Sequence, residues 1–322
     1  MTLIISLLSS NRITILADRR ISRAGQTIDD HYNKLCVFCC YDARVVFAFT
    51  GIATFEGFDT SSWLLQELHC LGGSDVPKIF DILEAIRSKI GAKLKSIGMS
   101  DQLLTIVVGG FWYEDDGVSH PLSCIITNGA DDGTVNANFL IVFNNTSVDY
   151  ALFLAGAKAA VPQPLADQLE DLAKRSLPRA SLIRKAVGTM QSAAGAPSSH
   201  GTIGDYSSSA TIDRRVNTPI LCTYHAPRGA NFAFGPNAVL PGLCSEGPEL
   251  MSMTLLSGPS LHKNKRCWCG SGKKFKQCHL KKFGSVYLNL PGFTAPLSWA
   301  VQVSAEDARP SGKTFTVSGG FE

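Results

Sequence analysis

Residues 2–18 read TLIISLLSSNRITILAD, and this stretch decides the fold because two apolar runs flank a polar turn. The runs are its first seven and last seven residues, and the Ser-Ser-Asn between them favours a reverse turn. We therefore predict a β-hairpin with a three-residue loop at 9–11. In this register Thr2 lies directly opposite Asp18, with the two Cβ atoms about 5 Å apart.

The rest of the first 225 residues contains blocks of strands and blocks of helices. Leucine and isoleucine recur at helical spacing within 57–71 and 76–99, and apolar runs bounded by turn residues indicate strands elsewhere. Such blocks indicate an α+β fold built in layers, not a doubly wound sheet. The predicted strands are 34–40, 45–50, 103–113, 121–127, 138–144, 149–153, 208–213 and 219–225, and two more helices are predicted at 164–175 and 180–194.

Three residues near the start of the chain carry the chemistry of an activated nucleophile. A threonine hydroxyl attacks a carbonyl only when a base takes its proton. If Met1 is removed, as is usual before a small residue, Thr2 gains a free α-amine whose pKa of about 8 suits that role. A nearby Lys34 would lower the pKa of the amine by charge repulsion, and Asp18 would keep the lysine charged and oriented. We therefore predict one site formed by Thr2, Asp18 and Lys34.

The segments MT, ILADRRIS, DHYNKL and VVFAFTGIA resemble the proteasome β-subunit family of N-terminal nucleophile hydrolases, which includes the bacterial HslV-type peptidases. That family spaces a terminal threonine, an aspartate and a lysine at intervals of sixteen residues, the spacing of Thr2, Asp18 and Lys34. The resemblance covers residues 2–225 and implies a four-layer αββα sandwich, threonine peptidase activity and a homo-oligomeric ring. It also implies that Gly51 supplies an oxyanion-binding N–H, and that an ATP-dependent unfoldase is a candidate partner.

The sequence departs from that family's pattern in its second half. The family supports the terminal amine with a serine between two glycines, whereas the matching stretch here, LAGAKAAV, has Gly156. The family also places an aspartate and a serine three residues apart, and the resemblance assigns these roles to Asp205 and Ser208 in GDYSSSA. Because Gly156 lacks the hydroxyl of that serine, a second function stays open, in which the chain is a catalytically inactive scaffold that acts through its basic, cysteine-containing segment at 261–283. A hydrolase of small amides is a further alternative, because the sequence defines no specificity pocket.

Residues 266–282 read RCWCGSGKKFKQCHLKK and have the composition of a metal site. Three thiolates and one imidazole are the ligands of a closed tetrahedral zinc site, and the glycines permit the sharp turn between them. The stretch resembles the SEC-C motif, a small zinc-binding module. Because protein ligands fill all four positions, the predicted zinc ion is structural, and we expect no other cofactor. The predicted ligands are Cys267, Cys269, Cys278 and His279.

The predicted organisation is a hydrolase domain at 2–225, a Gly/Pro-rich linker at 226–260, the zinc module at 261–283 and a tail at 284–322. The module has eight Lys or Arg and no acid, so a chain with a net charge of +3 has −5 on its remaining residues. We expect the basic module to bind an acidic protein surface or the phosphates of RNA.

Composition narrows the class of protein further. The chain has 322 residues and is 45% hydrophobic, which suits one large domain plus a small module. Most of its ten cysteines stand singly in apolar runs, which is typical of buried free thiols and not of a disulfide framework. No apolar run reaches the roughly 18 residues that cross a bilayer, and the start of the chain lacks a basic signal-peptide region. We expect a cytoplasmic protein without a membrane partner.

Overall fold

The structure is a computed structural model in which most of the first 225 residues, and several later strands, are described. The described residues are 2–23, 26–30, 32–40, 42–72, 78–115, 117–130, 133–144, 150–175, 178–215, 220–225, 233–234, 237–239, 254–255, 286–290, 293–302 and 314–321.

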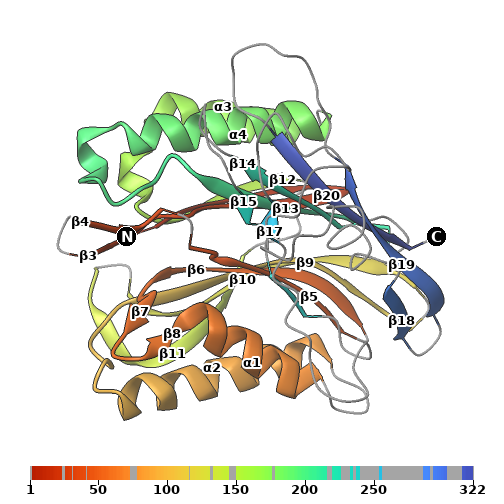
Figure 1. Cartoon of the computed structure of the whole chain (residues 1–322), viewed down its shortest axis with the longest axis horizontal. Helices are drawn as coiled ribbons and strands as arrows, with labels where there is room; N and C mark the ends of the chain where they lie inside the picture. Colours follow the sequence, from red (N-terminus) through yellow and green to blue (C-terminus); the bar gives the residue numbers. More distant parts are fainter. Residues whose placement is uncertain are drawn as a thin grey trace, which may run out of the picture.

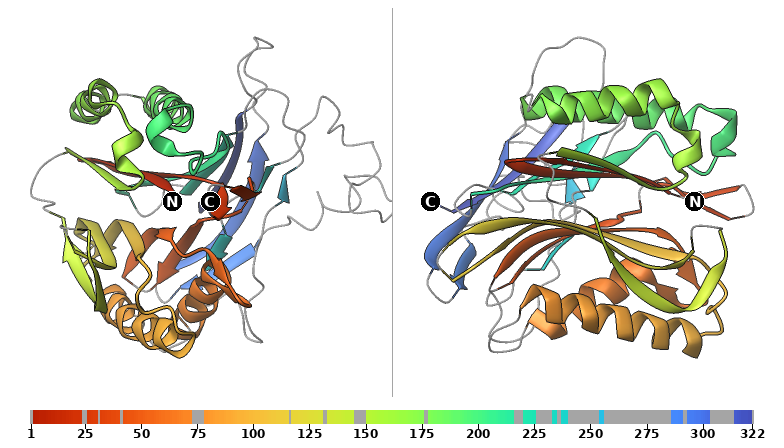
Figure 2. Two further views of the ribbon diagram at one scale, coloured as in Figure 1. Left: turned by 90° about the vertical axis from the view of Figure 1, so that its left-hand side faces the viewer. Right: turned by 180° about the vertical axis from the view of Figure 1, so that it is seen from behind.

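Four layers stack on one another, with two sheets inside and a pair of helices on each outer face (Figure 1). Helices α1 (Thr60–Gly72) and α2 (Ile79–Ser96) cover one sheet. Helices α3 (Gln163–Lys174) and α4 (Arg179–Ala194) cover the other. The predicted α+β class, built in layers, is therefore confirmed, and both further views show the same stacking (Figure 2).

The first sheet has eight strands in the order β12-β1-β2-β13-β14-β20-β19-β18, and all neighbouring strands in it pair antiparallel. Strands β1, β2, β12, β13 and β14 fall where the sequence predicts strands. Their bounds are β1 Leu3–Ser9, β2 Arg12–Asp18, β12 Tyr150–Gly156, β13 Ser207–Asp213, β14 Ile220–His225, β18 Val286–Leu290, β19 Phe293–Gln302 and β20 Thr314–Phe321.

The second sheet has six strands in the order β11-β10-β9-β6-β5-β16. Its bounds are β5 Leu35–Cys40, β6 Ala43–Gly51, β9 Leu104–Tyr113, β10 Ser119–Gly129, β11 Val135–Phe143 and β16 Asn237–Val239. Three two-stranded pairs complete the described strands: β3 Ile21–Arg23 with β4 Gln26–Asp29, β7 Thr54–Phe55 with β8 Phe58–Asp59, and β15 Ala233–Phe234 with β17 Thr254–Leu255.

The β1–β2 hairpin forms, but its predicted register is wrong by one residue. Ile4 pairs with Ala17, and Ser9 pairs with Arg12. The connection is therefore a two-residue turn, not the three-residue loop predicted at 9–11. As a consequence, Thr2 does not lie opposite Asp18 through the pairing of the hairpin.

The register error arises because both faces of this sheet are buried. Leu3 and Leu7 pack under α3 and α4 in one hydrophobic cluster, while Ile4 and Leu8 pack against the second sheet in another. An apolar/polar alternation fixes strand register only where one face meets water. Every residue of β1 is buried, so the alternation that would choose between the two registers is absent from its sequence.

Three hydrophobic clusters hold the layers together. One lies between the two sheets, one between the first sheet and helices α3 and α4, and one between the second sheet and helices α1 and α2. The amino-terminal strand contributes to two of them, so the start of β1 is held from both sides. Within the described residues, every helix is too short or too polar to be a candidate membrane span.

Strands also occur in the segments predicted as linker and tail. In the linker, β16 pairs in parallel with β5 and thereby extends the second sheet. In the tail, β20 pairs with β14, so that β18, β19 and β20 extend the first sheet. The predicted zinc module at 261–283 lies outside the described residues.

Candidate active site

Thr2 lies at the start of β1, between the two sheets. Its side chain approaches Lys34, the residue immediately before β5 of the second sheet. The Lys34 Nζ donates a hydrogen bond of 2.6 Å to the Thr2 Oγ1. Both residues are buried, with 5% of Thr2 and 2% of Lys34 exposed. The contact predicted from the spacing of these two residues is therefore present, and it joins one sheet to the other.

Asp18 ends β2 and accepts hydrogen bonds on both of its carboxylate oxygens. Its Oδ1 accepts from the backbone N–H of Leu3 at 2.7 Å. Its Oδ2 accepts from the Lys34 Nζ at 3.2 Å, the Arg20 N–H at 3.0 Å and the Gly204 N–H at 3.3 Å. Four donors thus surround a carboxylate that has no solvent exposure. The lysine, not the register of the hairpin, connects Asp18 to Thr2.

Lys34 uses all three of its ammonium hydrogens. Besides Thr2 and Asp18, its Nζ donates to the backbone carbonyl of Arg20 at 2.5 Å. Burial lowers the pKa of Lys34, the negative charge of Asp18 opposes this, and the positive charge of Arg19 lowers it further. A lysine whose pKa is lowered exchanges protons more readily near neutral pH, and its nitrogen touches the oxygen of a hydroxyl.

Gly51 is the last residue of β6 and has a left-handed backbone with φ of +107°. A Cβ at this position would lie 2.1 Å from the carbonyl oxygen of Leu103, the residue before β9, so the close approach of that backbone requires glycine here. The residue before it, Thr50, contacts Thr2, which places Gly51 beside the Thr2 backbone. Gly51 is exposed, so a bound substrate could reach its backbone.

Asp205 and Ser208, which the resemblance added to the site, have their contacts elsewhere. Ser208 is buried on β13 opposite Ala17, and its hydroxyl accepts a 2.8 Å hydrogen bond from the Arg19 Nη1. Asp205 is exposed. The Arg20 pKa is raised first by a hydrogen bond to Asp30, and the charge of Asp205 adds to this. No hydrogen bond within the described residues joins Asp205 or Ser208 to Thr2.

Sequence reasoning missed the role of Arg20. Its Nε forms a 2.6 Å ion pair with Asp30, and its Nη1 donates to the carbonyls of Gly201 and Ile203 at 3.2 Å. These bonds hold the segment that delivers the Gly204 N–H to Asp18. The sequence offers only the adjacency of Arg20 to Asp18, which does not reveal the partners of its side chain.

Sequence reasoning also missed Thr50, whose hydroxyl contacts the Thr2 backbone at two points. Thr50 is 2% exposed and precedes Gly51. A threonine inside an apolar strand has no pattern that distinguishes it from ordinary strand threonines. Only the packing of β6 against the start of β1 reveals where its hydroxyl points.

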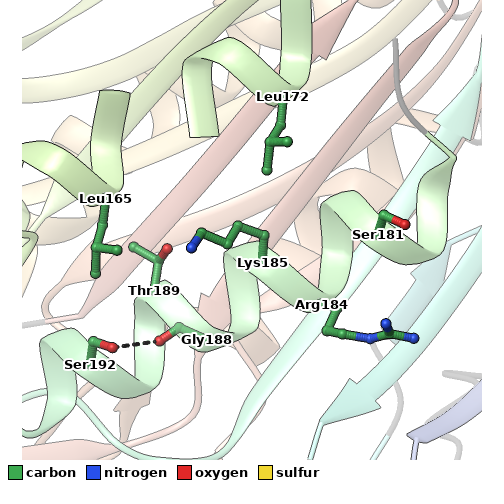
Figure 3. A pocket seen from close by; sticks show the side chains of 8 residues that line it. All are labelled: Leu165, Leu172, Ser181, Arg184, Lys185, Gly188, Thr189 and Ser192. Atoms are coloured by element: carbon green, nitrogen blue, oxygen red, sulfur yellow. Dashed lines mark hydrogen bonds between the residues drawn. The ribbon is translucent and has the colours of Figure 1, made fainter. Parts of the chain in front are cut away.

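A surface groove of about 450 Å³ lies between α3 and α4, in the outer helical layer that covers the first sheet (Figure 3). Leu165 and Leu172 line it from α3, and residues of α4 such as Thr189 line it from the other side. The groove shares no lining residue with the Thr2 site. It is therefore a separate surface feature of the outer helical layer.

The predicted metal ligands lie in the part of the chain that is not described. Among the described residues, no group of three or more His, Cys, Asp or Glu side chains could hold a metal ion. The SEC-C motif, however, is matched at residues 264–281, which contain all four predicted ligands. The SEC-C part of the sequence resemblance is thus confirmed at the level of the motif.

Comparison with known proteins gives few matches in sequence and more in structure. No curated protein matches the chain. Among solved structures, Anbu (ancestral beta-subunit) from Yersinia bercovieri is 14% identical, with a TM-score of 0.43, over 66% of this chain and 81% of that chain. The Anbu (Gly-1) mutant from Hyphomicrobium sp. strain MC1 is 12% identical, with a TM-score of 0.45, over 66% of this chain and 82% of that chain.

These comparisons correct the family inferred from the sequence. The similar structures reported above are Anbu proteins and not HslV-type or proteasome β-subunits, and no curated member of either group matches. The assignment to the proteasome β-subunit and HslV-type family was therefore wrong. The short segments that suggested it surround the residues of the Thr2 site, and segments of a few residues define a local arrangement without defining a family.

Proposed function

We propose that the chain is an N-terminal threonine hydrolase that cleaves peptide bonds, with Thr2 as the nucleophile. One observation carries this proposal: the Thr2 hydroxyl lies 2.6 Å from the ammonium of Lys34, which forms an ion pair with Asp18, and all three side chains are buried. Burying an ion pair can cost more free energy than the attraction between the charges returns, so the placement of this pair against a hydroxyl points to a functional role.

The mechanism begins with removal of Met1, which converts the Thr2 backbone nitrogen into an amine. A base takes the Oγ1 proton, and the oxygen attacks the carbonyl carbon of the substrate. The resulting oxyanion would be bound by the N–H of Gly51, a contribution of about 3 kcal/mol in comparable sites. The base then returns the proton to the leaving amine, and the acyl-threonine ester remains. Water, activated by the same base, hydrolyses the ester and restores the hydroxyl.

The base in this mechanism is the Thr2 amine, and Lys34 tunes it. A cation beside the amine favours its neutral form and lowers its pKa towards neutrality. Asp18 keeps that cation in place through the 3.2 Å contact to the Lys34 Nζ. The same ammonium donates a 2.6 Å hydrogen bond to the Thr2 Oγ1, which stabilises that oxygen as its proton passes to the amine.

We also propose that the SEC-C segment binds one structural zinc ion through Cys267, Cys269, Cys278 and His279. Three thiolates and an imidazole are a donor set that suits zinc, and the motif match covers all four residues. A segment of this size has too few residues for a core of its own, so the metal would supply its folding energy. Binding of an acidic protein or RNA by its lysines, and assembly of the chain into a ring, remain predictions.

A non-catalytic scaffold that acts through the SEC-C segment is the second candidate function. It is favoured by the contacts of Ser208, whose hydroxyl is bonded to Arg19 and not to Thr2. A hydrolase of small amides would use the same Thr2 chemistry on another substrate. A competition experiment with a peptide and a small amide gives the ratio of their kcat/KM values, and this ratio would separate it from a peptidase.

Intact-mass analysis with a peptide epoxyketone tests the leading proposal, since this electrophile forms a ring with both the hydroxyl and the amine of a terminal threonine. We expect a chain that lacks Met1 and gains one equivalent of reagent. The Thr2→Ala variant should gain none, and Thr105→Ala, which changes a threonine of β9, should react normally. Retention of Met1 without labelling would refute the mechanism and favour the scaffold, and equal labelling of Thr2→Ala would refute Thr2 as the nucleophile.

A further inference from the structure

The Thr50 hydroxyl makes two hydrogen bonds to the backbone of a single residue, Thr2. Its Oγ1 accepts from the Thr2 N–H at 3.3 Å and donates to the Thr2 carbonyl oxygen at 3.2 Å. The Thr2 carbonyl also accepts from the Ala157 N–H at 2.9 Å. Thr50 is buried, so water does not compete for these bonds.

These two bonds control one torsion angle. The nitrogen and the carbonyl oxygen of Thr2 lie on either side of its Cα–C bond, and rotation about that bond changes the distance between them. A hydroxyl that binds both atoms therefore holds the rotation. Holding it also fixes the direction of the Thr2 Cα–Cβ bond relative to the carbonyl group, and the Oγ1 on that Cβ accepts the hydrogen bond from the Lys34 Nζ.

Gly156 leaves the space in which this arrangement forms. A Cβ at Gly156 would lie 1.8 Å from the Thr2 carbonyl oxygen and 2.5 Å from the Thr50 Oγ1. The first distance cannot be accommodated unless the Thr2 backbone moves, and the second cannot unless the Thr50 side chain moves. Position 156 therefore cannot supply a side chain to the Thr2 amine, and Thr50 is the residue whose hydroxyl reaches it.

We propose that Thr50 is a positioning residue for the nucleophile, which holds the Thr2 amine and hydroxyl in the reactive geometry and accepts a hydrogen bond from the amine after Met1 is removed. This inference rests on the proposed function. An acceptor beside the amine favours its charged form. Thr50 therefore raises the pKa of the amine, whereas the positive charge of Lys34 lowers it.

The test compares the full-length wild type with Thr50→Val, which keeps the shape of the side chain and removes its hydroxyl. The reaction rate with the peptide epoxyketone is measured by intact mass from pH 5.5 to 9, after Met1 removal is verified for each protein. We expect Thr50→Val to react about tenfold more slowly, the loss expected from about one buried hydrogen bond. Its acidic limb should move to lower pH by about 0.5 unit, because the neutral amine is then favoured.

Two further variants separate positioning from folding. Thr50→Ser keeps the hydroxyl and should react within about threefold of the wild type. Thr14→Val removes another buried hydroxyl, the one bonded to Thr211 at 3.0 Å, and should leave both the rate and the acidic limb unchanged. If Thr50→Val does not fold, the pair Thr50→Ala and Thr50→Ser answers the same question.

The outcomes distinguish this inference from the function on which it rests. If the wild type loses Met1 and reacts, but Thr50→Val has the same rate and the same acidic limb, only the role of Thr50 is refuted. An equal loss in Thr14→Val would also refute it, since the effect would then be a general one on the core. A wild type that keeps Met1 or does not react overturns both proposals.

Discussion

Replacement of Asp18 by asparagine is the perturbation whose effect on stability the structure defines best. The carboxylate accepts from Lys34, Arg20 and Gly204 on Oδ2 and from Leu3 on Oδ1. An asparagine has the same shape but only one accepting oxygen. In either orientation, its amide hydrogens face at least one donor, and the charge that balances Lys34 is lost.

The expected loss is about 3 kcal/mol, because one partner of a fully buried ion pair is removed and the other remains. For a domain of this size, that loss corresponds to a fall in melting temperature of about 10 °C. Urea and thermal unfolding of Asp18→Asn, Lys34→Met and the double variant give the measurement. The double variant should recover at least about 1.5 kcal/mol relative to the sum of the two single losses, because no charge is then left unpaired.

Asp30→Asn is the matched control, since it breaks the 2.6 Å pair with Arg20 in which the side chains are 20% and 30% exposed. Partly exposed pairs contribute about 1 kcal/mol or less. The reasoning would be refuted if Asp18→Asn cost no more than this control, or if the losses of the two single variants simply added in the double variant.

Three other predictions follow from single residues. Gly156→Ala should unfold at a markedly lower temperature than Gly57→Ala, because both glycines have positive φ but only the first would place a Cβ against Thr2, and equal losses would contradict the predicted clash. Burial lowers the pKa of His225 to about 3, so the unfolded chain binds a proton between pH 6.5 and 3 that the folded chain does not. Stability should therefore fall as the pH drops through that window, and urea titrations should show a flatter dependence for His225→Gln. Metal analysis of the purified chain should find one zinc ion, and Cys267→Ser should lose it; an unchanged content would remove Cys267 from the ligand set.

The elements of the layered fold could be predicted from the sequence because their patterns are local. The helical spacing of Ile79, Ile82, Leu83, Ile86 and Ile90 is a property of one segment, and all five residues are buried in α2. The register of β1 and β2 could not be predicted, because it depends on what covers each face of the sheet, and both faces are covered. The strands in 286–321 were also missed, since they join the first sheet through the pairing of β20 with β14, which are far apart in the chain.

Some residues of the candidate site could likewise be predicted from the sequence, and others could not. The contact between Thr2, Lys34 and Asp18 could be predicted because Thr2 and Asp18 border one predicted hairpin and Lys34 begins the next predicted strand, at a spacing of sixteen residues. Thr50 could not be found, since its importance depends on a backbone torsion of another residue. Ser208 was assigned through the family resemblance, by its spacing from Asp205, but its side chain is directed to Arg19, and spacing does not report the direction of a side chain.

The pairing of β14 with β20 affects how the SEC-C segment can be studied. Strands of one continuous sheet lie both before this segment, at β14, and after it, at β18 to β20. The segment is therefore an internal insertion in the chain, and a stop codon placed before it would also delete three strands of the sheet. A loss of function in such a truncation could then come from the missing SEC-C segment or from the missing strands, and the experiment would not distinguish them. Excision of 261–283 with a short Gly/Ser bridge removes the insertion alone.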